Sequence, residues 1–437
     1  MPGTLKTDVL IVGGGLAGVR AAQAAADAGA RCLLVTKASI GQGGASARAS
    51  GGFATAVGKA DSAEQHIKDT VSGGYGLNNA PQVAVIARSA PEVLSRLNAE
   101  VGGFAESGAL FRGEPAPVHT VPRSVQYPHG MAHLMSCLRD KLRAADVELL
   151  ENHRVVDLQL RADGRVIGGQ FYSSATGELL TCRARAVVLA AGGCGQLFPV
   201  TSNGPDATGD AYALAVRAGC TLQDMEFIQY TPTAFAAPAA LRGHTIVGTL
   251  LSIAGVRLLN GLGERFMERY APVQLEGADR ATLARAIFAE VTEGRGTAAG
   301  GVYLDATSVS SDDFNRHRPG FYDLCVAHGI DPCSAPLETA PAVHTCLGGI
   351  KVDGAFSAAP HLYVAGEALA GTHGANRLSS NSLTEANVSG WMAGENAAEC
   401  AFESDFKPFA EPKVTCRLPA RGQLEMADMR AQLQRVT

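Results

Sequence analysis

The chain has 437 residues, of which 46% are hydrophobic and 18% are charged, and it contains 51 glycines. This composition is typical of a compact α/β protein of two domains and excludes a disordered or fibrous chain. The formal net charge is −5 and no Lys/Arg-rich tract is present, so no nucleic-acid partner is expected.

Ten cysteines are scattered along the chain without a C-x-x-C pair, which argues against a zinc ribbon or an iron–sulfur centre. No metal site is expected, and the cysteines are predicted to be mostly buried in a reducing compartment. The apolar segment from Val9 to Val35 lacks a basic leader and is interrupted by charged residues and a glycine turn. It is predicted to be a core segment rather than a membrane span, in a cytoplasmic protein.

The first predicted elements form a βαβ unit. A buried strand over Asp8–Val12 is followed by a glycine-rich turn, a helix to about Ala28, a stop at Gly29 and a second strand over Arg31–Thr36. The turn has the G-x-G-x-x-G spacing, in which the glycines make the turn, admit a pyrophosphate and let helix and strand pack closely. A nucleotide site is therefore predicted here, with contacts from Gly13, Gly15, Leu16, Ala17 and Gly18.

The second strand ends in Thr36-Lys37 instead of the acidic residue that binds a ribose hydroxyl in a simple NAD site. A Gly/Ser/Ala-rich loop over residues 41–50 then leads to Gly51-Gly52 and could lie along an extended cofactor.

A second glycine-rich turn, Gly192-Gly193, follows an apolar strand that begins at Val187. Thr208-Gly209-Asp210 then opens a helix that stops at Gly219. The Asp210 carboxylate is suited either to accept a hydrogen bond from a cofactor hydroxyl or to cap that helix.

A third such segment runs from Tyr363 to Leu383. A strand enters Gly366-Glu367, a loop rich in small residues follows, and Arg377 offers a planar fork for a carboxylate. Ser382 and Glu385 have the spacing of a capping box, which predicts a helix that begins at Ser382.

Together these motifs resemble those of the flavoprotein subunits of succinate dehydrogenase and fumarate reductase, a family that includes L-aspartate oxidase. The resemblance covers most of residues 8–400. Besides the glycine-rich turns, it includes Met225–Tyr230, Gly263–Tyr270, Val343-His344 and Gly348–Ile350.

The resemblance implies an α/β fold, with a doubly wound, Rossmann-like FAD-binding domain and an inserted α+β capping domain. The expected boundaries are 1–226 and 341–437 for the two parts of the FAD-binding domain and 227–340 for the capping domain. Residues Leu424–Val436 resemble the first helix of a C-terminal helical domain, which is either lost or replaced by a partner chain. An electron-transfer partner or second subunit is a further expectation.

The cofactor implied by the resemblance is FAD. Glu367 would contact its ribityl chain, and the Ser382 and Leu383 amides would face its pyrimidine ring. The family often attaches FAD to a histidine whose position falls here at about Ala45, so non-covalent FAD is predicted. Further cofactor contacts are expected from Thr36, Lys37, Ser46, Gly51, Gly52, Val155, Ala191, Gly192, Asp210 and Arg377.

The family reaction moves a hydride at one carbon of a C–C bond beside a carboxylate and a proton at the neighbouring carbon. By resemblance Arg280 is the proton carrier, with a salt-bridged arginine at a helix start as the alternative. His344 and Arg377 match the carboxylate clamp, although His344 could instead be a core histidine.

Two further residues are expected to contact substrate, each with a structural alternative. His373 could instead hold its loop, and Arg123 could instead be a surface arginine.

Two departures from the family pattern concern the substrate. Thr231 stands where the family has a histidine, and Leu251–Val256 stands where an Arg-Gly-Glu-Gly-Gly run supplies substrate contacts. The pocket is therefore expected to be less polar than one that binds succinate, fumarate or aspartate, with Thr231 as a remaining hydrogen-bond donor.

The leading hypothesis is an FAD-dependent oxidoreductase that reduces or forms a C=C bond next to the carboxylate of a small substrate. One alternative is an amino-acid oxidase similar to L-aspartate oxidase, although the carboxylate that such enzymes carry shortly before a histidine is displaced to Glu114, ahead of His119. Another is an FAD-bearing electron-transfer subunit that needs a partner chain.

Overall fold

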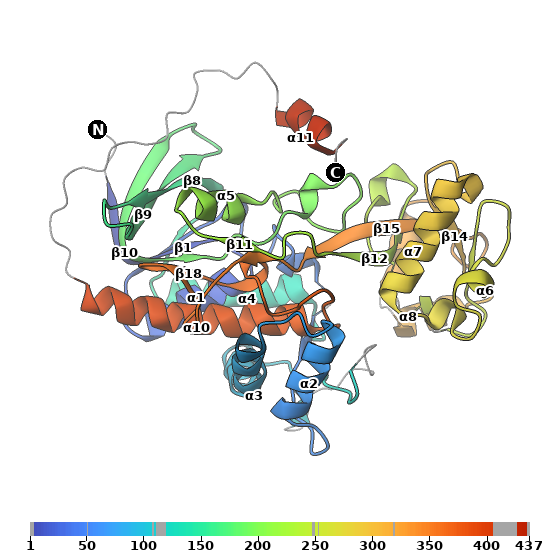
Figure 1. Ribbon diagram of the computed structural model, residues 1–437, viewed down its shortest axis with the longest axis horizontal. Helices are drawn as coiled ribbons and strands as arrows, with labels where there is room; N and C mark the ends of the chain where they lie inside the picture. The colour runs from blue at the N-terminus through green and yellow to red at the C-terminus, as the bar shows by residue number, and fades with distance from the viewer. Residues whose placement is uncertain are drawn as a thin grey trace. The chain divides into compact units, whose positions relative to one another are not determined.

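The computed structural model describes residues 4–49, 51–106, 109–110, 119–246, 250–251, 253–317, 320–404 and 426–434. The chain divides into two compact units (Figure 1). Unit 1 takes in the described residues of 1–197, 204–228 and 345–436, and unit 2 those of 198–203 and 229–344.

Unit 1 is built on an eight-stranded sheet whose central strands are parallel. In the order of the sheet, the parallel strands are β18 (Leu362–Val364), β10 (Leu179–Leu189), β1 (Leu5–Val12), β2 (Cys32–Val35) and β7 (Glu148–Leu150). The antiparallel strands are β17 (Ser357–Ala359), β9 (Val166–Ser173) and β8 (His153–Leu160). Residues 9–11 of β1 are fully buried, as expected for an apolar parallel strand covered on both faces.

The predicted N-terminal βαβ unit is confirmed. Helix α1 (Leu16–Asp27) follows β1, and the chain leaves the helix through Gly29, whose φ of +91° is accessible to glycine at low cost. The helix that was predicted to open at Asp210 is α5 (Asp210–Arg217). Its chain likewise leaves through a glycine, Gly219, with φ +83°.

The other helices of unit 1 are α2 (Ala63–Gly73), α3 (Ala80–Val101), α4 (Met131–Ala144), α10 (Asn381–Glu403) and α11 (Met426–Gln434). Helix α11 lies in the segment that was predicted to be helical from its resemblance to a C-terminal domain. Short strand pairs complete the unit: β3 (Gly52–Ala54) with β6 (Ser124–Gln126), β4 (Ala105–Glu106) with β5 (Ala109–Leu110), and β11 (Leu222–Gln223) with β16 (Gly349–Ile350). Within the described residues, none of the helices is long and apolar enough to cross a membrane.

Helix α10 packs along α1 at backbone distance (Figure 1). A Cβ atom on Gly390 would lie 2.4 Å from the Ala17 carbonyl oxygen, and one on Gly394 would lie 2.3 Å from that of Ala21. Both distances are too short for any side chain, so two glycines one helical turn apart are what allows the two helices to approach so closely.

The start of α10 differs from the prediction. The helix begins at Asn381, and its N-cap is Ser380 in a left-handed conformation, with φ +67° and no side-chain capping bond. Ser382 is therefore the second helical residue, and the capping box with Glu385 does not form. Glu385 is instead hydrogen-bonded to the His373 ring at 2.9 Å.

Unit 2 combines a four-stranded sheet with short helices. The strands, in sheet order, are β12 (Ile228–Phe235), β15 (Leu337–Cys346), β14 (Val302–Asp305) and β13 (Arg257–Leu259). The helices are α6 (Met267–Tyr270), α7 (Arg280–Glu290), α8 (Ser311–His317) and α9 (Phe321–Ala327). Stacked rings of Phe235, Phe314 and Phe321 form part of a core separate from that of unit 1.

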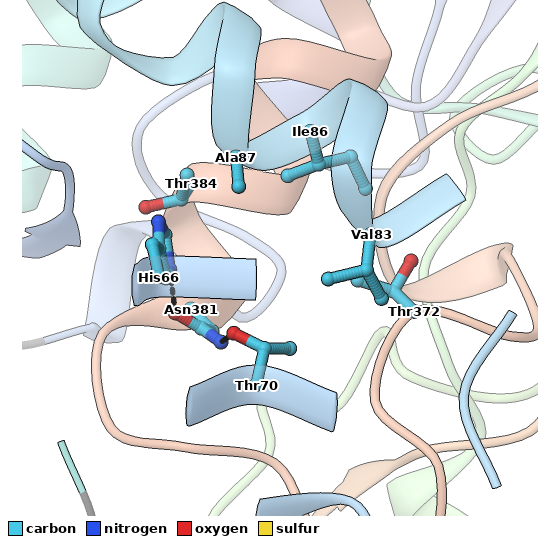
Figure 2. Close-up of a pocket in the computed structure, with 8 residues that line it drawn as sticks. All are labelled: His66, Thr70, Val83, Ile86, Ala87, Thr372, Asn381 and Thr384. Atoms are coloured by element: carbon cyan, nitrogen blue, oxygen red, sulfur yellow. Dashed lines mark hydrogen bonds between the residues drawn. The ribbon is translucent and has the colours of Figure 1, made fainter. Parts of the chain in front are cut away.

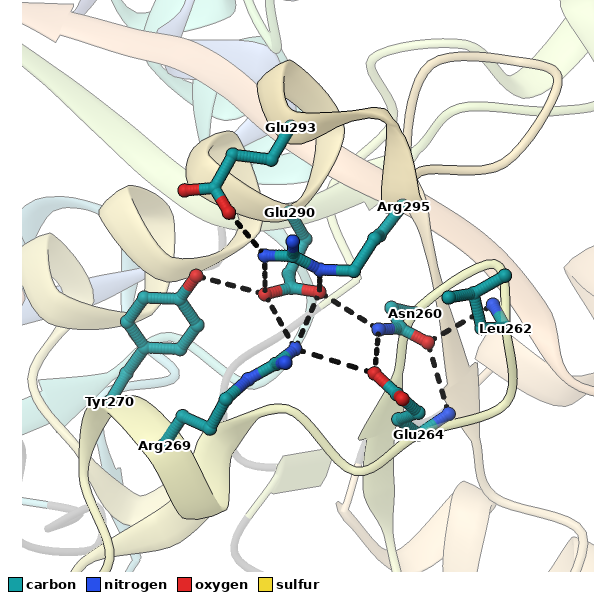
Figure 3. A network of polar contacts seen from close by, with 8 residues as sticks. All are labelled: Asn260, Leu262, Glu264, Arg269, Tyr270, Glu290, Glu293 and Arg295. Atoms are coloured by element: carbon teal, nitrogen blue, oxygen red, sulfur yellow. Dashed lines mark hydrogen bonds and ion pairs between the residues drawn. The ribbon is translucent and has the colours of Figure 1, made fainter.

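The last residue of α7, Glu290, is the centre of a buried polar network in unit 2 (Figure 3). Its side chain has no solvent exposure and accepts hydrogen bonds of 2.8–2.9 Å from Arg295, Arg269, Tyr270 and Asn260. These hydrogen bonds, with that from Arg295 the strongest influence, lower the pKa of Glu290 to about 2. The carboxylate therefore joins the end of α7 to the segment around α6.

We expect Glu290→Gln to lower the free energy of unfolding at pH 7 by about 3 kcal/mol, because the variant leaves two arginines facing a neutral amide. The folded-state pKa lies below the unfolded-state value, so this stabilisation is complete above about pH 5 and is lost as the pH falls towards 2. Thermal unfolding followed by circular dichroism at several pH values measures the difference. The matched control is Glu293→Gln, since Glu293 pairs with Arg295 at the surface; an equal loss in both variants would contradict the role of Glu290.

We expect Gly394→Ala to destabilise the protein by about 1–2 kcal/mol, although alanine has the higher helix propensity by about 1 kcal/mol. The added methyl group would meet the Ala21 carbonyl oxygen, which belongs to a helix backbone that cannot move aside. Thermal unfolding measures the effect, with Glu399→Ala on the exposed side of the same helix as control. A midpoint that stays constant or rises would show that the two helices are not held at backbone contact.

Candidate functional site

The N-terminus of α1 has the features of a phosphate-binding turn. Gly13 has φ +115°, and a Cβ there would lie 2.2 Å from the Ala190 oxygen, while a Cβ on Gly18 would lie 1.9 Å from the Gly13 oxygen. These two glycines make the tight turn and the close packing. Gly15, the N-cap, faces only the Ser46 hydroxyl, which accepts a hydrogen bond from the Leu16 amide at 2.9 Å. Gly15 has no side chain to cap the helix, so the amides after Leu16 and the positive end of the helix dipole suit an anion.

The residues after β2 are joined to the start of α5. Lys37 forms an ion pair with Asp210 and donates a hydrogen bond to the Thr208 hydroxyl at 2.7 Å. Burial raises the pKa of Asp210, but Lys37, the Thr208 hydroxyl and Arg154 together leave that pKa below its usual value. The N-cap of α5 is Gly209, so the alternative role of Asp210 as a helix cap is wrong.

Glu367 brings two of the predicted cofactor segments together. Its Oε1 atom accepts a hydrogen bond from the Cys346 amide at 3.1 Å, and a Cβ on Gly193 would lie 2.3 Å from the same oxygen. Gly192 has φ +72°, which fits the predicted glycine turn at the end of β10. Burial raises the pKa of the Glu367 carboxyl group. The Glu367 carboxyl group thus lies against the backbone of Gly193, at a distance that leaves no room for a side chain there.

The remaining predicted cofactor residues belong to unit 1 and differ in burial. Gly52 lies in β3 against Ser380, while Val155 is buried in β8. Ser382 and Leu383 are the second and third residues of α10, where helix amides lack intrahelical partners. The others lie at the ends of strands or in turns, namely Thr36 after β2, Gly51 before β3 and Ala191 after β10.

Two predicted substrate residues of unit 1 lie in the loop before α10. Arg377 is 6% exposed and donates a hydrogen bond to the Leu378 carbonyl at 3.0 Å. Its charge also acts to lower the pKa of Glu367. His373 is buried, and its Nε2 atom contacts Glu385 at 2.9 Å, which is the arrangement expected if this histidine holds the loop against α10.

Arg123 is fully buried, so its interpretation as a surface arginine is wrong. It forms ion pairs with Asp61 at 3.0 Å and Asp69 at 2.9 Å. Two carboxylates compensate its charge, which argues against a primary role in binding an anion. These partners could not be found from the sequence, because no recognisable motif connects the three positions.

Arg280 is the first residue of α7 in unit 2, and Asp279 caps that helix by accepting from the Ala281 and Thr282 amides. In the part of the chain that is described, Arg280 makes no hydrogen bond or ion pair, so the alternative of a salt-bridged arginine is not observed there. Burial lowers the pKa of its guanidinium. A cation at a helix N-terminus is also unfavourable for the helix dipole, so this arginine is costly in structural terms.

The other substrate residues of unit 2 lie on two neighbouring strands. His344 is half-buried on β15, and its Nδ1 atom contacts the Ser202 hydroxyl at 2.8 Å. Thr231 is buried on β12. Leu251 and Val256, at the ends of the segment that replaces the family's charged run, are buried in the core of unit 2.

One small pocket lies between helices of unit 1 (Figure 2), and none of the residues that line it is a predicted catalytic residue. Val83, Ile86 and Ala87 of α3 line it together with residues of α2 and α10. Within it, Asn381 is hydrogen-bonded to the His66 ring and the Thr70 hydroxyl, and burial lowers the pKa of His66 to about 4. The histidine is therefore neutral at pH 7, and these bonds anchor the start of α10 to α2.

Comparison with known proteins places these features in a family. Residues 8–383 match the FAD binding domain family. One subunit of the fumarate reductase (CoM/CoB) of Methanothermobacter marburgensis is 36% identical over 407 residues, which cover 91% of this chain and 74% of that protein. An L-aspartate oxidase of Streptomyces coelicolor is 36% identical over 396 residues, which cover 88% of this chain and 67% of that protein.

Solved structures agree with the sequence relatives. A chain of the Mycobacterium smegmatis Sdh1 complex in its apo form matches with a TM-score of 0.85 and 30% identity, over 99% of this chain and 76% of that chain. A variant of FrdA from Escherichia coli quinol fumarate reductase matches with a TM-score of 0.84 and 30% identity, over 93% and 72%. The predicted fold class and FAD as cofactor are thereby confirmed. The chain belongs to the family of FAD-binding flavoproteins that includes succinate dehydrogenase, fumarate reductase and L-aspartate oxidase, and it is an FAD-dependent oxidoreductase.

Proposed function

We propose that this protein reduces or forms a C=C bond next to the carboxylate of a small substrate, with Arg280 moving the proton. Bound FAD would supply the hydride acceptor or donor. Its pyrophosphate would lie on the N-terminus of α1, and Asp210 and Glu367 would accept from its hydroxyl groups. Unit 2 would be the capping domain that was expected from the sequence.

The observation that carries the proposal is that the Arg280 guanidinium is desolvated and has no described carboxylate partner. An arginine has a pKa above about 12 in water and is a poor acid there. Burial lowers the pKa of Arg280, and no described carboxylate raises it again. Desolvation of an unpaired guanidinium is the change that makes proton release easier. A structural arginine would instead be paired, as Arg123 and Arg295 are.

Arg377 and His344 are proposed as residues that bind the substrate carboxylate. A planar guanidinium binds a carboxylate through two parallel hydrogen bonds, which fixes the orientation of the substrate. Ser202 fixes the ring of His344 through the Nδ1 atom. Holding the substrate in one orientation is a large part of what such a reaction requires, since the protein must align two carbon atoms.

The substrate class is proposed to be a carboxylate other than a four-carbon dicarboxylate. Leu251 and Val256 contribute to a hydrophobic core instead of offering charged groups, and Thr231 offers a hydroxyl in place of an imidazole. A second carboxylate of the substrate would therefore lack the partners that bind it in the family.

A second candidate function is oxidation of an amino acid, and the similarity to L-aspartate oxidase favours it. The resemblance to chains of succinate dehydrogenase and fumarate reductase complexes also favours an electron-transfer partner or second subunit for this chain.

A cytoplasmic location is proposed because ten cysteines without a C-x-x-C pair suit a reducing compartment.

Anaerobic mixing of the FAD-loaded protein with saturated acids, dicarboxylates and amino acids tests the function. We expect a saturated acid other than succinate to bleach the flavin absorbance. Arg280→Ala should slow the bleaching by about 10²-fold or more, because the proton carrier is lost. Arg285→Ala, on the same helix, is the matched control. Bleaching by an amino acid with release of ammonia would instead establish the second candidate, and an unchanged rate in Arg280→Ala would exclude the proton-carrier role.

FAD is proposed to bind without a covalent link, because Ala45 stands at the position of the linking histidine. Acid precipitation should therefore release all of the flavin into the supernatant, and the denatured chain should have the mass of the sequence alone. Flavin that remains with the precipitated chain would show that another side chain forms the link.

A further inference from the structure

Two cysteines of unit 1 are in direct contact, although they are 152 positions apart in the sequence. The sulfur atoms of Cys194 and Cys346 are 3.0 Å apart, and both side chains are buried, with exposures of 5% and 3%. Cys194 follows the glycine turn after β10, and Cys346 is the last residue of β15. A disulfide has an S–S distance of about 2.05 Å, so a shift of about 1 Å separates this contact from a bond.

The contact lies beside Glu367. The Cys346 amide donates to the Glu367 carboxylate at 3.1 Å, and Gly193, which precedes Cys194, lies against the same oxygen. Tyr212 donates a hydrogen bond to the Glu367 carbonyl group at 3.3 Å. A movement of Cys346 or of Gly193-Cys194 that brings the two sulfur atoms together would therefore act on two of the groups in contact with the Glu367 side chain.

We propose that Cys194 and Cys346 form a reversible disulfide when the protein meets hydrogen peroxide, and that this bond weakens the hold of Glu367 on FAD. The first part depends only on the contact between the sulfur atoms. The second part rests on the proposed role of Glu367 as an FAD ligand. Reduced flavins that react with oxygen are a source of peroxide, so the oxidant fits the chemistry of the cofactor.

The reaction is a two-electron oxidation with peroxide as oxidant. The Cys346 thiolate attacks one peroxide oxygen, the O–O bond breaks, and the departing hydroxide takes up the released thiol proton as water. The product is a sulfenic acid on Cys346. The Cys194 sulfur then attacks the Cys346 sulfur, the S–O bond breaks, and the hydroxyl group leaves as a second water with the Cys194 proton. Two thiols and one hydrogen peroxide thus give one disulfide and two waters.

The contact with the Cys194 sulfur lowers the pKa of Cys346, which favours Cys346 as the attacking sulfur. The other buried cysteines of the sheet differ in this respect. Burial raises the pKa of Cys32 and of Cys182 to about 12, and a thiol of that kind is unreactive. Reactivity is therefore expected at the pair and not at buried cysteines in general.

The test of the disulfide uses the FAD-loaded protein, treated with hydrogen peroxide and then unfolded under acid conditions for thiol titration and peptide mapping. We expect the loss of two thiols, a cross-link between the peptides that contain Cys194 and Cys346, and recovery of both thiols with dithiothreitol. Cys194→Ser and Cys346→Ser should each abolish the cross-link, while the control Cys182→Ser should behave like the wild type. No cross-link, or over-oxidation of Cys346 without one, would overturn the proposal.

The test of the link to FAD compares the rate of FAD release from the oxidised and the reduced protein, followed by flavin fluorescence. We expect release to become about threefold faster or more on oxidation, as for the loss of one hydrogen bond, and to be unaffected by peroxide in Cys194→Ser. In Glu367→Gln, oxidation should change release much less. Disulfide formation with unchanged FAD release would reject the role of Glu367 in this response. Neither the cross-link nor the rate of FAD release requires turnover. Both results can therefore be interpreted whether or not the protein catalyses the proposed reaction.

Discussion

The contact between α1 and α10 is the constraint on which the nucleotide end of this protein depends. Gly390 and Gly394 allow α10 to contact the backbone of α1 at Ala17 and Ala21. Gly366, which precedes α10, also lies against the Ala17 side chain. The two helices come from opposite ends of the chain, yet each contributes its N-terminus to the predicted FAD site. Because the contact is between backbones, it leaves little freedom in how those two N-termini are placed.

The charged side chains with a structural role have a partner of opposite charge, and the candidate catalytic side chain does not. Lys37 is paired with Asp210, Arg123 with two aspartates, and Glu290 with two arginines. Each of these partly or fully buried charges has an opposite charge that makes its burial tolerable. Arg280 lacks such a partner among the described residues and stands at the positive end of a helix. An uncompensated cation costs stability, and a reaction that needs a labile proton is a physical reason for keeping one.

The parts of the structure that the sequence predicted well are those determined by local patterns. The βαβ unit could be placed to within about three residues at each boundary, because glycine spacing and an apolar strand specify it locally. The start of α10 was misplaced, since Ser380 is left-handed and makes a tertiary contact that no local motif shows: its carbonyl accepts from the Ala54 amide of β3 at 3.2 Å. The partners of Arg123 and the contact of Cys194 with Cys346 were missed for the same reason, because each joins distant segments without a motif.

The segment Leu251–Val256 and Thr231 are the residues on which the proposed change of substrate rests. The glycine turns, Lys37, Asp210 and Glu367 lie in unit 1, whereas Thr231 and the replaced segment lie in unit 2. Helices α1 and α10 both belong to unit 1, so substitutions in unit 2 do not change the residues at their contact. In unit 2 itself, Leu251 and Val256 gain burial in an apolar core, and a charged run at the same place would lose it. The proposed loss of polar substrate contacts would therefore favour the stability of unit 2, and a less polar substrate is what the proposal expects in return.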